Sequence, residues 1–233
     1  DNAPAYLDAI MSSAESLLLM VDDILDYSRI EAGAVELQPA PFRVGDLVSS
    51  AIRVVETRAR EKHLSVQTQI GAADGRVLLA DHGKIRRVLL SLLDNAVKFT
   101  AEGRIIVTTS LETDPSSDAA RLLITVADTG VGLPPENVDR LFEPFVQGSD
   151  PAHQGGGAGL GLAIARRLTE LTGGMLTGAN RPGGGSAFTI DLPVRLLGAL
   201  PETTSAPVPA SGRVLVVDDD EVSRLVTAGM LDA

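Results

Sequence analysis

Apolar residues recur at intervals of three and four over the first thirty positions of the chain. The recurring positions are Leu7, Ile10, Ala14, Leu17, Val21 and Ile24, and the series ends at the polar Ser28. Acidic residues seven apart lie on the opposite face, so the pattern predicts a helix with a heptad seam, for which Gly33 is a typical C-terminal stop. Two interpretations fit this seam equally. The helix pairs with another helix, antiparallel or from a second chain, or it packs on its own domain.

Beyond Pro39 and Pro41, helical and alternating patterns are interspersed. Helical spacing predicts helices over 44–62, over 83–99, at about 137–141 and after the glycine cluster at 155–161. Alternation and apolar runs predict strands over 64–70, 76–80, 104–111, 121–128, 175–179 and 186–192. The elements show no regular strand–helix–strand repeat, which favours an α+β fold, a two-layer sandwich of helices on antiparallel strands.

The last part of the chain has a different character. Residues 196–212 are rich in Pro, Ala, Ser and Thr without any period, which is typical of an exposed linker. Residues 213–233 read as a buried strand ending in three Asp, followed by the start of a helix, and are too short to fold alone. We therefore expect a helical part at 1–38, a main domain at 39–195, a linker, and the beginning of a further α/β domain.

Composition narrows the possible functions. The 233 residues are 44% hydrophobic and 22% charged, as in globular proteins, but only 3% aromatic with no Trp, so Leu, Val, Ile and Ala must build the core. A net charge of -11 argues against non-specific nucleic-acid binding. The absence of cysteine excludes disulfides, thiol catalysis and thiolate metal sites, and fits a reducing compartment. No apolar run approaches the roughly 20 residues that span a bilayer.

Candidate chemistry begins on the predicted helix at 83–99. Ser91, Asn95 and Lys98 are spaced i, i+4 and i+7, so they share one stripe of this helix. An Asn amide oxygen suits a hard cation such as Mg²⁺, and a Lys ammonium one turn further on suits phosphate oxygens. Taken alone, an ordinary solvated polar face explains the stripe more simply.

Two glycine-containing segments carry further candidates. Asp128 ends an apolar strand and is followed by Gly130 and Gly132, which places a carboxylate, suited to an exocyclic amine such as that of adenine, beside backbone that a ligand can approach. A plain turn is the simpler alternative. The cluster at 155–161 precedes a helix, and a helix N-terminus favours anions. Its spacing matches neither the P-loop nor the dinucleotide-binding pattern.

The order of these segments resembles the ATP-binding catalytic domain of sensor histidine kinases, within the gyrase, Hsp90, histidine kinase and MutL superfamily. SLLDNAVKFT is similar to the N box, DTGVGLP to the first glycine box, LFEPFVQ to the F box, GGGAGLGL to the second glycine box and GGGSAF to a third. The resemblance covers about 42–193 and implies a Bergerat-type ATP-binding fold.

The flanking segments extend this resemblance. LMVDDILDYSRIEAG (19–33) resembles the end of the second helix of a dimerisation and phosphotransfer domain, which implies a coiled-coil-like helix before the main domain. RVLVVDDDEVSR (213–224) resembles the first strand of a receiver domain. A kinase core followed by a receiver is the arrangement of hybrid histidine kinases.

The resemblance assigns roles to individual residues. It implies that Asn95 ligates Mg²⁺ bridging the ATP phosphates and that Lys98 contacts those phosphates. It implies that Asp128 binds the adenine amine in a pocket lined by Gly130 and Gly132. It also assigns to the ATP lid and its borders Phe142, Phe145, Gly157, Gly159, Leu160 and Gly161.

The sequence departs from the family pattern in three places. Ser91 stands where a second Asn is usual, which makes it a weak Mg²⁺ ligand at best, and Ala158 stands where Thr is common. Asp218 and Asp219 match the acidic Mg²⁺ pair of a receiver, but the rest of that site is missing. The phosphoacceptor His of the family lies on a helix absent from this sequence, so we assign no catalytic residue within the chain.

The sequence thus predicts the ATP-binding core of a protein-histidine kinase, with ATP and Mg²⁺ as cofactors. Such a core transfers the ATP γ-phosphoryl to a His on the dimerisation helix and onward to a receiver Asp. The expected partners are a second copy, through the N-terminal helix, and a receiver domain or response regulator. We expect a cytoplasmic location, with or without a membrane anchor in the parent protein. The alternative is a degenerate, non-phosphorylating ATP-binding module acting in regulation or assembly.

Overall fold

A computed structural model describes residues 3–71, 73–113, 117–134, 138–146 and 159–197 of the chain. The chain divides into two units, Asp1–Ala199 and Leu200–Ala233. The predicted linker at 196–212 begins inside the last strand, which continues to Leu197. The rest of the linker and the receiver segment with Asp218 and Asp219 lie outside the described residues, as do Gly157 and Ala158.

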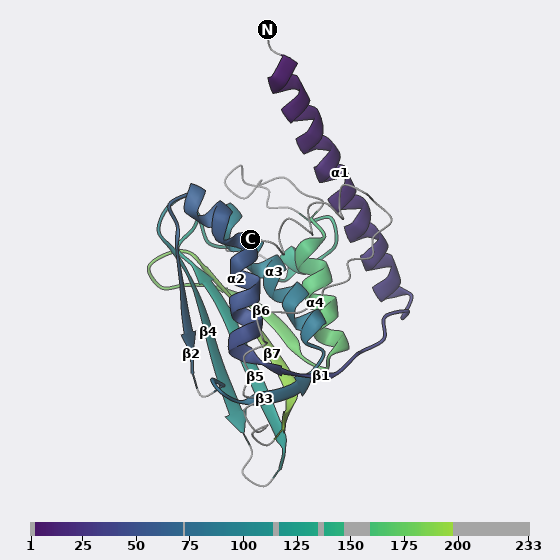
Figure 1. Cartoon of the computed structure of the whole chain (residues 1–233), viewed down its shortest axis with the longest axis vertical. Coiled ribbons are helices and arrows are strands. Elements are labelled where there is room, and N and C mark those ends of the chain that lie inside the picture. Colours follow the sequence, from purple (N-terminus) through teal and green to yellow (C-terminus); the bar gives the residue numbers. More distant parts are fainter. Residues whose placement is uncertain (1–2, 72, 114–116, 135–137, 147–158, 198–233) are drawn as a thin grey trace, which may run out of the picture. The chain divides into compact units, whose positions relative to one another are not determined.

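The first unit contains helices and strands in mixed order (Figure 1). Its helices are α1 (Ala3–Glu31), α2 (Val44–Glu61), α3 (His82–Phe99), the 3-10 helix η1 (Val138–Phe142) and α4 (Gly161–Leu171). Its strands are β1 (Ala40–Arg43), β2 (Ser65–Ile70), β3 (Val77–Ala80), β4 (Arg104–Thr113), β5 (Ala119–Asp128), β6 (Met175–Asn180) and β7 (Ser186–Leu197).

These strands form one mixed sheet with the order β1-β3-β7-β5-β4-β2, and β6 pairs with β7. The β4–β5 and β5–β7 pairs are antiparallel, whereas β2 pairs with β4 in parallel. Helices α2, α3 and α4 cover one face of the sheet (Figure 1). The predicted α+β two-layer sandwich is thus confirmed.

The core lies between this helical layer and the sheet. Because side chains alternate along a strand, β5 buries Leu122, Ile124 and Val126 on the face that α3 covers, and leaves the residues between them on the outer face. The buried side chains are mainly Leu, Ile, Val and Ala, as the composition predicts. On the outer face the hydroxyls of Thr125 and Thr189 lie 3.0 Å apart.

Two proline-containing segments differ from the sequence-based expectation. Pro41 lies within β1, a short strand that pairs with β3 on one side only, and such an edge position tolerates a residue without an N–H donor. Strand β7 continues past Pro193 to Leu197. Pro193 lies opposite Arg121 in the ladder with β5, but on its other side the β6 pairing ends at Asp191 and the β3 pairing begins at Arg195. On that side no paired strand needs an N–H from residue 193.

Helix α1 packs on its own domain through its C-terminal part. Ile30 is buried in the core and Tyr27 is packed against it. Arg87 of α3 pairs with Asp26, and it also lies 3.8 Å from Asp23. The pKa of Asp23 is raised, mainly by burial, although Arg87 lowers it.

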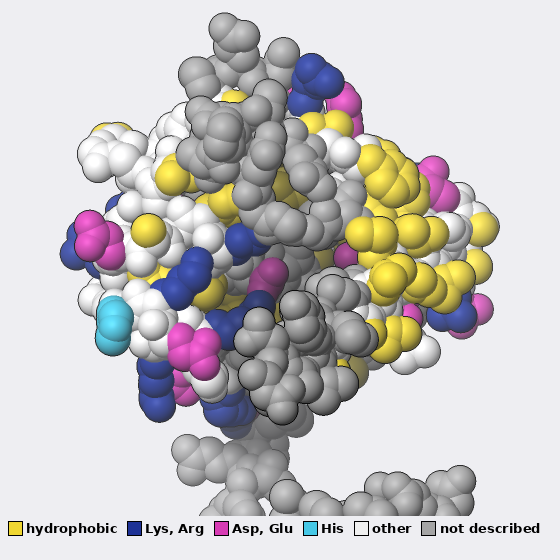
Figure 2. All heavy atoms as spheres, turned by 90° about the horizontal axis from the view of Figure 1, so that it is seen from above, with side chains coloured by type: hydrophobic (Ala, Val, Ile, Leu, Met, Phe, Trp, Pro, Cys, Tyr) yellow, Lys and Arg dark blue, Asp and Glu magenta, His cyan; other side chains and the backbone are white. Residues whose placement is uncertain are grey.

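Much of α1 nevertheless remains uncovered. Its exposed large hydrophobic residues are Met11, Leu17, Leu18, Met20, Val21, Ile24 and Leu25. Figure 2 shows hydrophobic side chains gathered on the side of the molecule where α1 stands. Of the helices that the structure describes, none has both the length and the apolarity needed to cross a membrane.

Asp81 fixes the start of α3. It is the N-cap residue, and its carboxylate accepts hydrogen bonds from Lys84 N at 3.0 Å and from Gln38 N at 2.9 Å. The second bond ties the segment after α1 to the first turn of α3. Burial alone would raise the pKa of Asp81, but these bonds and the Lys84 ammonium outweigh it and hold the pKa below the ordinary 3.8.

We predict that Asp81→Ala lowers the free energy of unfolding at pH 7 by about 0.5–2 kcal/mol, as for the loss of an N-cap. Because the folded-state pKa is lowered, this contribution is present above the unfolded pKa and disappears as the pH falls through the folded value. The difference between the two proteins should therefore shrink as the pH falls below about 4. Urea unfolding across this pH range tests it, with the exposed Asp74→Asn as the control. An equal loss in the control would contradict the assignment.

Candidate functional site

Ser91, the first residue of the polar stripe of α3, faces the beginning of α4. Ser91, Asn95 and Lys98 are all half-buried on α3. A Cβ atom placed on Gly161, the first residue of α4, would lie 3.1 Å from Ser91 Oγ. The structure therefore brings together the N-box stripe and the helix that follows the glycine cluster, which are about 70 residues apart in sequence.

Asp128 lies at the end of β5 and is only 4% exposed. Its carboxylate accepts hydrogen bonds from Ser186 Oγ at 2.5 Å and from the backbone N–H of Gly130 at 2.8 Å and of Ser186 at 3.3 Å. A buried carboxylate needs such partners, because an unpaired charge is costly in the interior. The three donors also hold the side chain in one orientation.

Glycines allow the backbone to close around Asp128. A Cβ atom on Gly130 would lie 2.3 Å from the carbonyl oxygen of Phe99, at the end of α3. A Cβ atom on Gly185, which has φ +83°, would lie 2.1 Å from the carbonyl oxygen of Asp128. No larger residue fits either position without a backbone shift. The first and third glycine segments of the sequence thus pack against each other.

The C-terminal end of α3 holds a second cation besides Lys98. The Lys62 ammonium donates hydrogen bonds to the carbonyl oxygens of Val97 at 2.8 Å and of Lys98 at 3.0 Å. These bonds satisfy carbonyls that have no partner within the helix. The Lys98 ammonium lies 5.0 Å from the centre of the Phe99 ring. Burial lowers the pKa of Lys98, and the nearby Asp94 carboxylate raises it in part.

The two Phe residues of the F box lie in different environments. Phe142 is 6% exposed and packs edge-to-face on Phe188 of β7, with ring centres 6.2 Å apart. Phe145 is 63% exposed and has φ +64°, which is unusual for a residue other than glycine. Its N–H donates to the carbonyl oxygen of Gly159 at 3.1 Å. Phe142 is thus anchored in the core, whereas Phe145 is held through its backbone.

Gly159 and Leu160 form the border of α4. Gly159 has φ +70°, and a Cβ atom there would lie 2.9 Å from the carbonyl oxygen of Val146. Leu160 is buried and is the residue before the first turn of α4. Gly159 thus allows a close backbone approach that a larger residue would prevent, and Leu160 anchors the start of α4 in the core.

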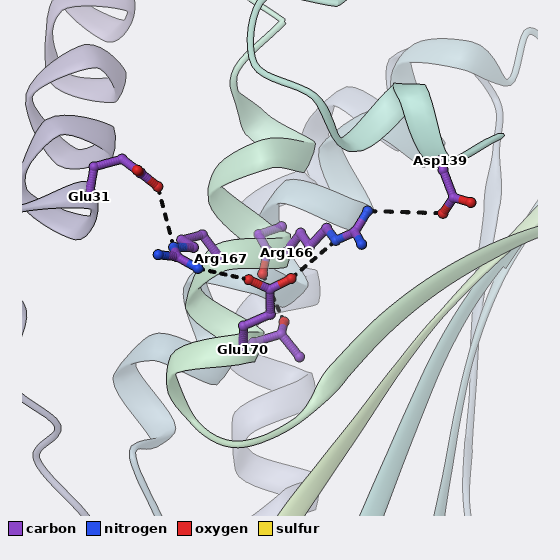
Figure 3. Close-up of polar contacts among 7 residues, drawn as sticks. Glu31, Asp139, Arg166, Arg167 and Glu170 are labelled. Atoms are coloured by element: carbon purple, nitrogen blue, oxygen red, sulfur yellow. Dashed lines mark hydrogen bonds and ion pairs between the residues drawn. The ribbon is translucent and has the colours of Figure 1, made fainter. Parts of the chain in front are cut away.

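A chain of ion pairs links α4 to its neighbours (Figure 3). Glu170 pairs with both Arg166 and Arg167 of its own helix, each at 3.2 Å. Arg167 also pairs with Glu31 of α1 at 3.3 Å, and Arg166 lies 3.9 Å from Asp139 of η1. All five side chains are largely solvent-accessible, so each pair contributes little to stability.

Sequence reasoning missed three residues around Asp128. Besides Ser186, Arg181 Nη1 donates to the carbonyl oxygen of Asp128 at 2.6 Å, and Asn180 bonds to the backbone of Leu133. The register of β5 and β7 places Ala127 opposite Ala187, so Ser186 comes beside Asp128. The alternation of both strands would have found Ser186 if their pairing had been assumed. Nothing in the local sequence points to Asn180 or Arg181.

Comparison with known proteins identifies the family. Residues 80–196, about half of the chain, match the model described as "Histidine kinase-, DNA gyrase B-, and HSP90-like ATPase". The chain belongs to this family. The two-layer sandwich described above is therefore the ATPase domain of this family. Its buried carboxylate, Asp128, lies at the end of the central strand β5.

Curated relatives are longer sensor proteins. The chain is 37% identical over 229 residues to the sensor protein TorS of Escherichia coli (strain K12), covering 97% of this chain and 24% of TorS. It is 36% identical over 220 residues to the sensor histidine kinase GacS of Pseudomonas protegens, covering 94% of this chain and 24% of GacS. It spans about a quarter of the length of these two relatives.

Solved structures show the same fold. Full-length ShkA in complex with AMPPNP superposes with a TM-score of 0.71 at 33% identity, covering 85% of this chain and 40% of that chain. The histidine kinase AdeS of Acinetobacter baumannii superposes with a TM-score of 0.64 over 80% of this chain and 82% of that one. At 22% identity, the likeness to AdeS concerns the fold alone.

We predict that Ser186→Ala destabilises the protein in the absence of any ligand. The Asp128 carboxylate would keep two backbone donors but lose its hydroxyl donor in a buried place, at a cost of about 1–3 kcal/mol. Urea unfolding measures this change. The control is Thr189→Val, which removes a hydroxyl from the outer face of the same strand. If both variants lose the same stability, the buried bond has no special role.

Proposed function

We propose that this chain is the ATP-binding core of a hybrid histidine kinase. One observation carries the proposal: a buried carboxylate, Asp128, is fixed by three donors between glycine-containing segments whose backbones pack closely around it. The names of the relatives, which are sensor proteins and a sensor histidine kinase, support the same assignment.

Asp128 suits the adenine amine because its acceptor capacity is not exhausted. An ionised carboxylate offers about four acceptor positions, and three protein donors leave one for a ligand. Gly130 and Gly132 would then line the base with backbone atoms alone. A Cβ atom on either would meet Phe99 or Asn180, so these glycines let the loop approach those two neighbours. This assignment also explains why the carboxylate is oriented before any ligand arrives.

The phosphates fit between α3 and α4. Lys98 supplies a cation at the end of the N-box stripe, and the N-terminus of α4 at Gly161 supplies backbone N–H groups and the positive end of the helix dipole. Asn95 would hold Mg²⁺ through its amide oxygen, with Ser91 as a weaker ligand. The described residues contain no group of three or more His, Cys, Asp or Glu able to hold a metal, so phosphate and water oxygens would complete the coordination. The bound Mg²⁺ would neutralise phosphate charge.

In this proposal the phosphoryl acceptor is a His of a dimerisation helix, as the resemblance to the family implies. Of the three histidines of the chain, His63 follows α2 with φ +55°, and His82 begins α3 with its ring stacked on Phe42. The third, His153, lies outside the described residues. The kinase core would therefore position ATP and stabilise the charge of the transferring group, which are the main sources of catalysis in phosphoryl transfer. A receiver Asp would accept the phosphoryl group in the next step.

A second copy of the chain is the partner that α1 suits best. Its uncovered hydrophobic residues recur at heptad spacing, and such a seam is buried when two helices of a dimer pack together. We therefore include a homodimer through α1 in the proposal.

ATP binding gives the first test. Asp128→Asn should lower the affinity for ATP about 10-fold or more. The carboxylate that accepts a hydrogen bond from the adenine amine is replaced by a neutral amide, so a charge-assisted hydrogen bond is lost. Titration with a fluorescent ATP analogue in the presence of Mg²⁺ measures the change. Asp191→Asn is the matched control, since Asp191 pairs with Arg121 away from the proposed pocket. An unaltered affinity in Asp128→Asn would overturn the assignment of the pocket.

Phosphotransfer gives the second test, in a protein extended upstream to include the phosphoacceptor helix. We expect acid-labile phosphohistidine to form from γ-labelled ATP. Asn95→Ala should reduce its formation at least 10-fold, because Mg²⁺ and the phosphates lose a ligand. Glu56→Gln on α2, which removes only a surface ion pair with Arg60, is the control. Measurable ATP binding without phosphohistidine would instead support the non-phosphorylating module, for which Ser91 and Ala158, the two departures from the family pattern, are the supporting observations.

A further inference from the structure

The end of the β6–β7 hairpin holds the loop that follows Asp128. Asn180, the last residue of β6, accepts a hydrogen bond from Leu133 N at 2.6 Å and donates one to the carbonyl oxygen of Leu133 at 2.9 Å. One amide side chain thus pairs with both backbone groups of a single residue 47 positions earlier. This is the pairing that a neighbouring strand would otherwise provide.

The shape of the loop is matched to this contact. Gly132 has φ +78°, and a Cβ atom there would lie 2.7 Å from Asn180 Oδ1. Gly178 in the middle of β6 makes room for the Phe188 ring, which a Cβ atom there would meet at 2.9 Å, and the Leu133 side chain lies beside the same position. Gly132 therefore allows the loop to approach Asn180 of β6 directly.

The residue after Asn180 holds the other end of the same loop. Arg181 Nη1 donates to the carbonyl oxygen of Asp128 at 2.6 Å. Two consecutive residues of the hairpin thus bind the first and the last part of the segment from Asp128 to Leu133. The backbone between these contacts contains Gly130 and Gly132, the positions assigned above to the base pocket.

We propose that Asn180 is a positioning residue of the nucleotide site, which holds the wall of the base pocket at a fixed distance from the Asp128 carboxylate. The inference rests on the proposed binding of ATP at Asp128. Asn180 need not touch the nucleotide. It acts through Gly132 and Leu133, whose backbone it holds in the conformation that the base meets.

The exposure of the Asn180 side chain distinguishes a positioning role from a role in global stability. Asn180 is exposed, so its hydrogen bonds compete with water and contribute little to global stability. The same bonds remove conformational freedom from the loop before the ligand binds, and such preorganisation increases affinity. Losing Asn180 should therefore affect nucleotide binding much more than folding.

The test compares wild type and Asn180→Ala in the full chain with Mg²⁺ present, using competition against a fluorescent ATP analogue. We expect ATP to bind about five- to tenfold more weakly. The preference for ATP over inosine triphosphate, which lacks the exocyclic amine, should fall several-fold because the base is held less precisely against Asp128. The midpoint of thermal unfolding without nucleotide should move by less than about 4 °C. Asn180→Asp keeps the acceptor for Leu133 N and should show an intermediate loss.

Thr177→Ala, at an exposed position of the same strand, is the matched control and should leave both ligands unaffected. If wild type itself fails to bind ATP, the proposed function is wrong. If wild type binds ATP and Asn180→Ala has the same affinity and the same preference between the two nucleotides, the positioning role is wrong. A weaker affinity accompanied by a large fall in the unfolding midpoint would also overturn it, because the residue would then be structural.

Discussion

The close approach of the β6–β7 turn to the end of β5 is the contact on which the candidate site depends. The turn reaches the backbone of Asp128 only because Gly185 has no side chain, since a Cβ atom there would lie 2.1 Å from the Asp128 carbonyl oxygen. Once the turn is in place, Ser186 meets the Asp128 carboxylate and Arg181 meets the Asp128 carbonyl group. The buried carboxylate thereby gains a hydroxyl donor, and the loop after it is held by the hairpin. The hydrogen bonds to Asp128 therefore depend on the absence of a side chain at Gly185.

Helix α3 connects this site to the rest of the unit. Asp81 caps its first turn, Lys62 binds its last carbonyl groups, and Phe99 at its end receives the backbone of Gly130. Both ends of the helix are therefore fixed by residues from other elements. On its other side α3 carries Arg87, which pairs with α1. The helix with the proposed Mg²⁺ and phosphate ligands is thus joined by an ion pair to the candidate dimerisation helix, which itself packs against α4.

Sequence periodicity predicted the elements well wherever one face is buried, as in α2, α3, β4 and β5. It failed at Pro41 and Pro193, because the tolerance of a strand for proline depends on whether a neighbour needs its N–H. The resemblance to the family grouped Phe142 with Phe145. Phe142 is buried because it packs on Phe188, which lies on a strand more than 40 residues later, whereas Phe145 is exposed.

The chain by itself determined the layer architecture, the family and the kinds of chemical group available, because these follow from periodicity, composition and the order of short motifs. Only the tertiary structure decided which groups meet. Ser186, Arg181 and Asn180 contact the segment from Asp128 to Leu133 across 47 to 58 residues of sequence. Such contacts depend on strand register and on the close approach of two backbones, and neither property can be read from the residues near either end of the contact.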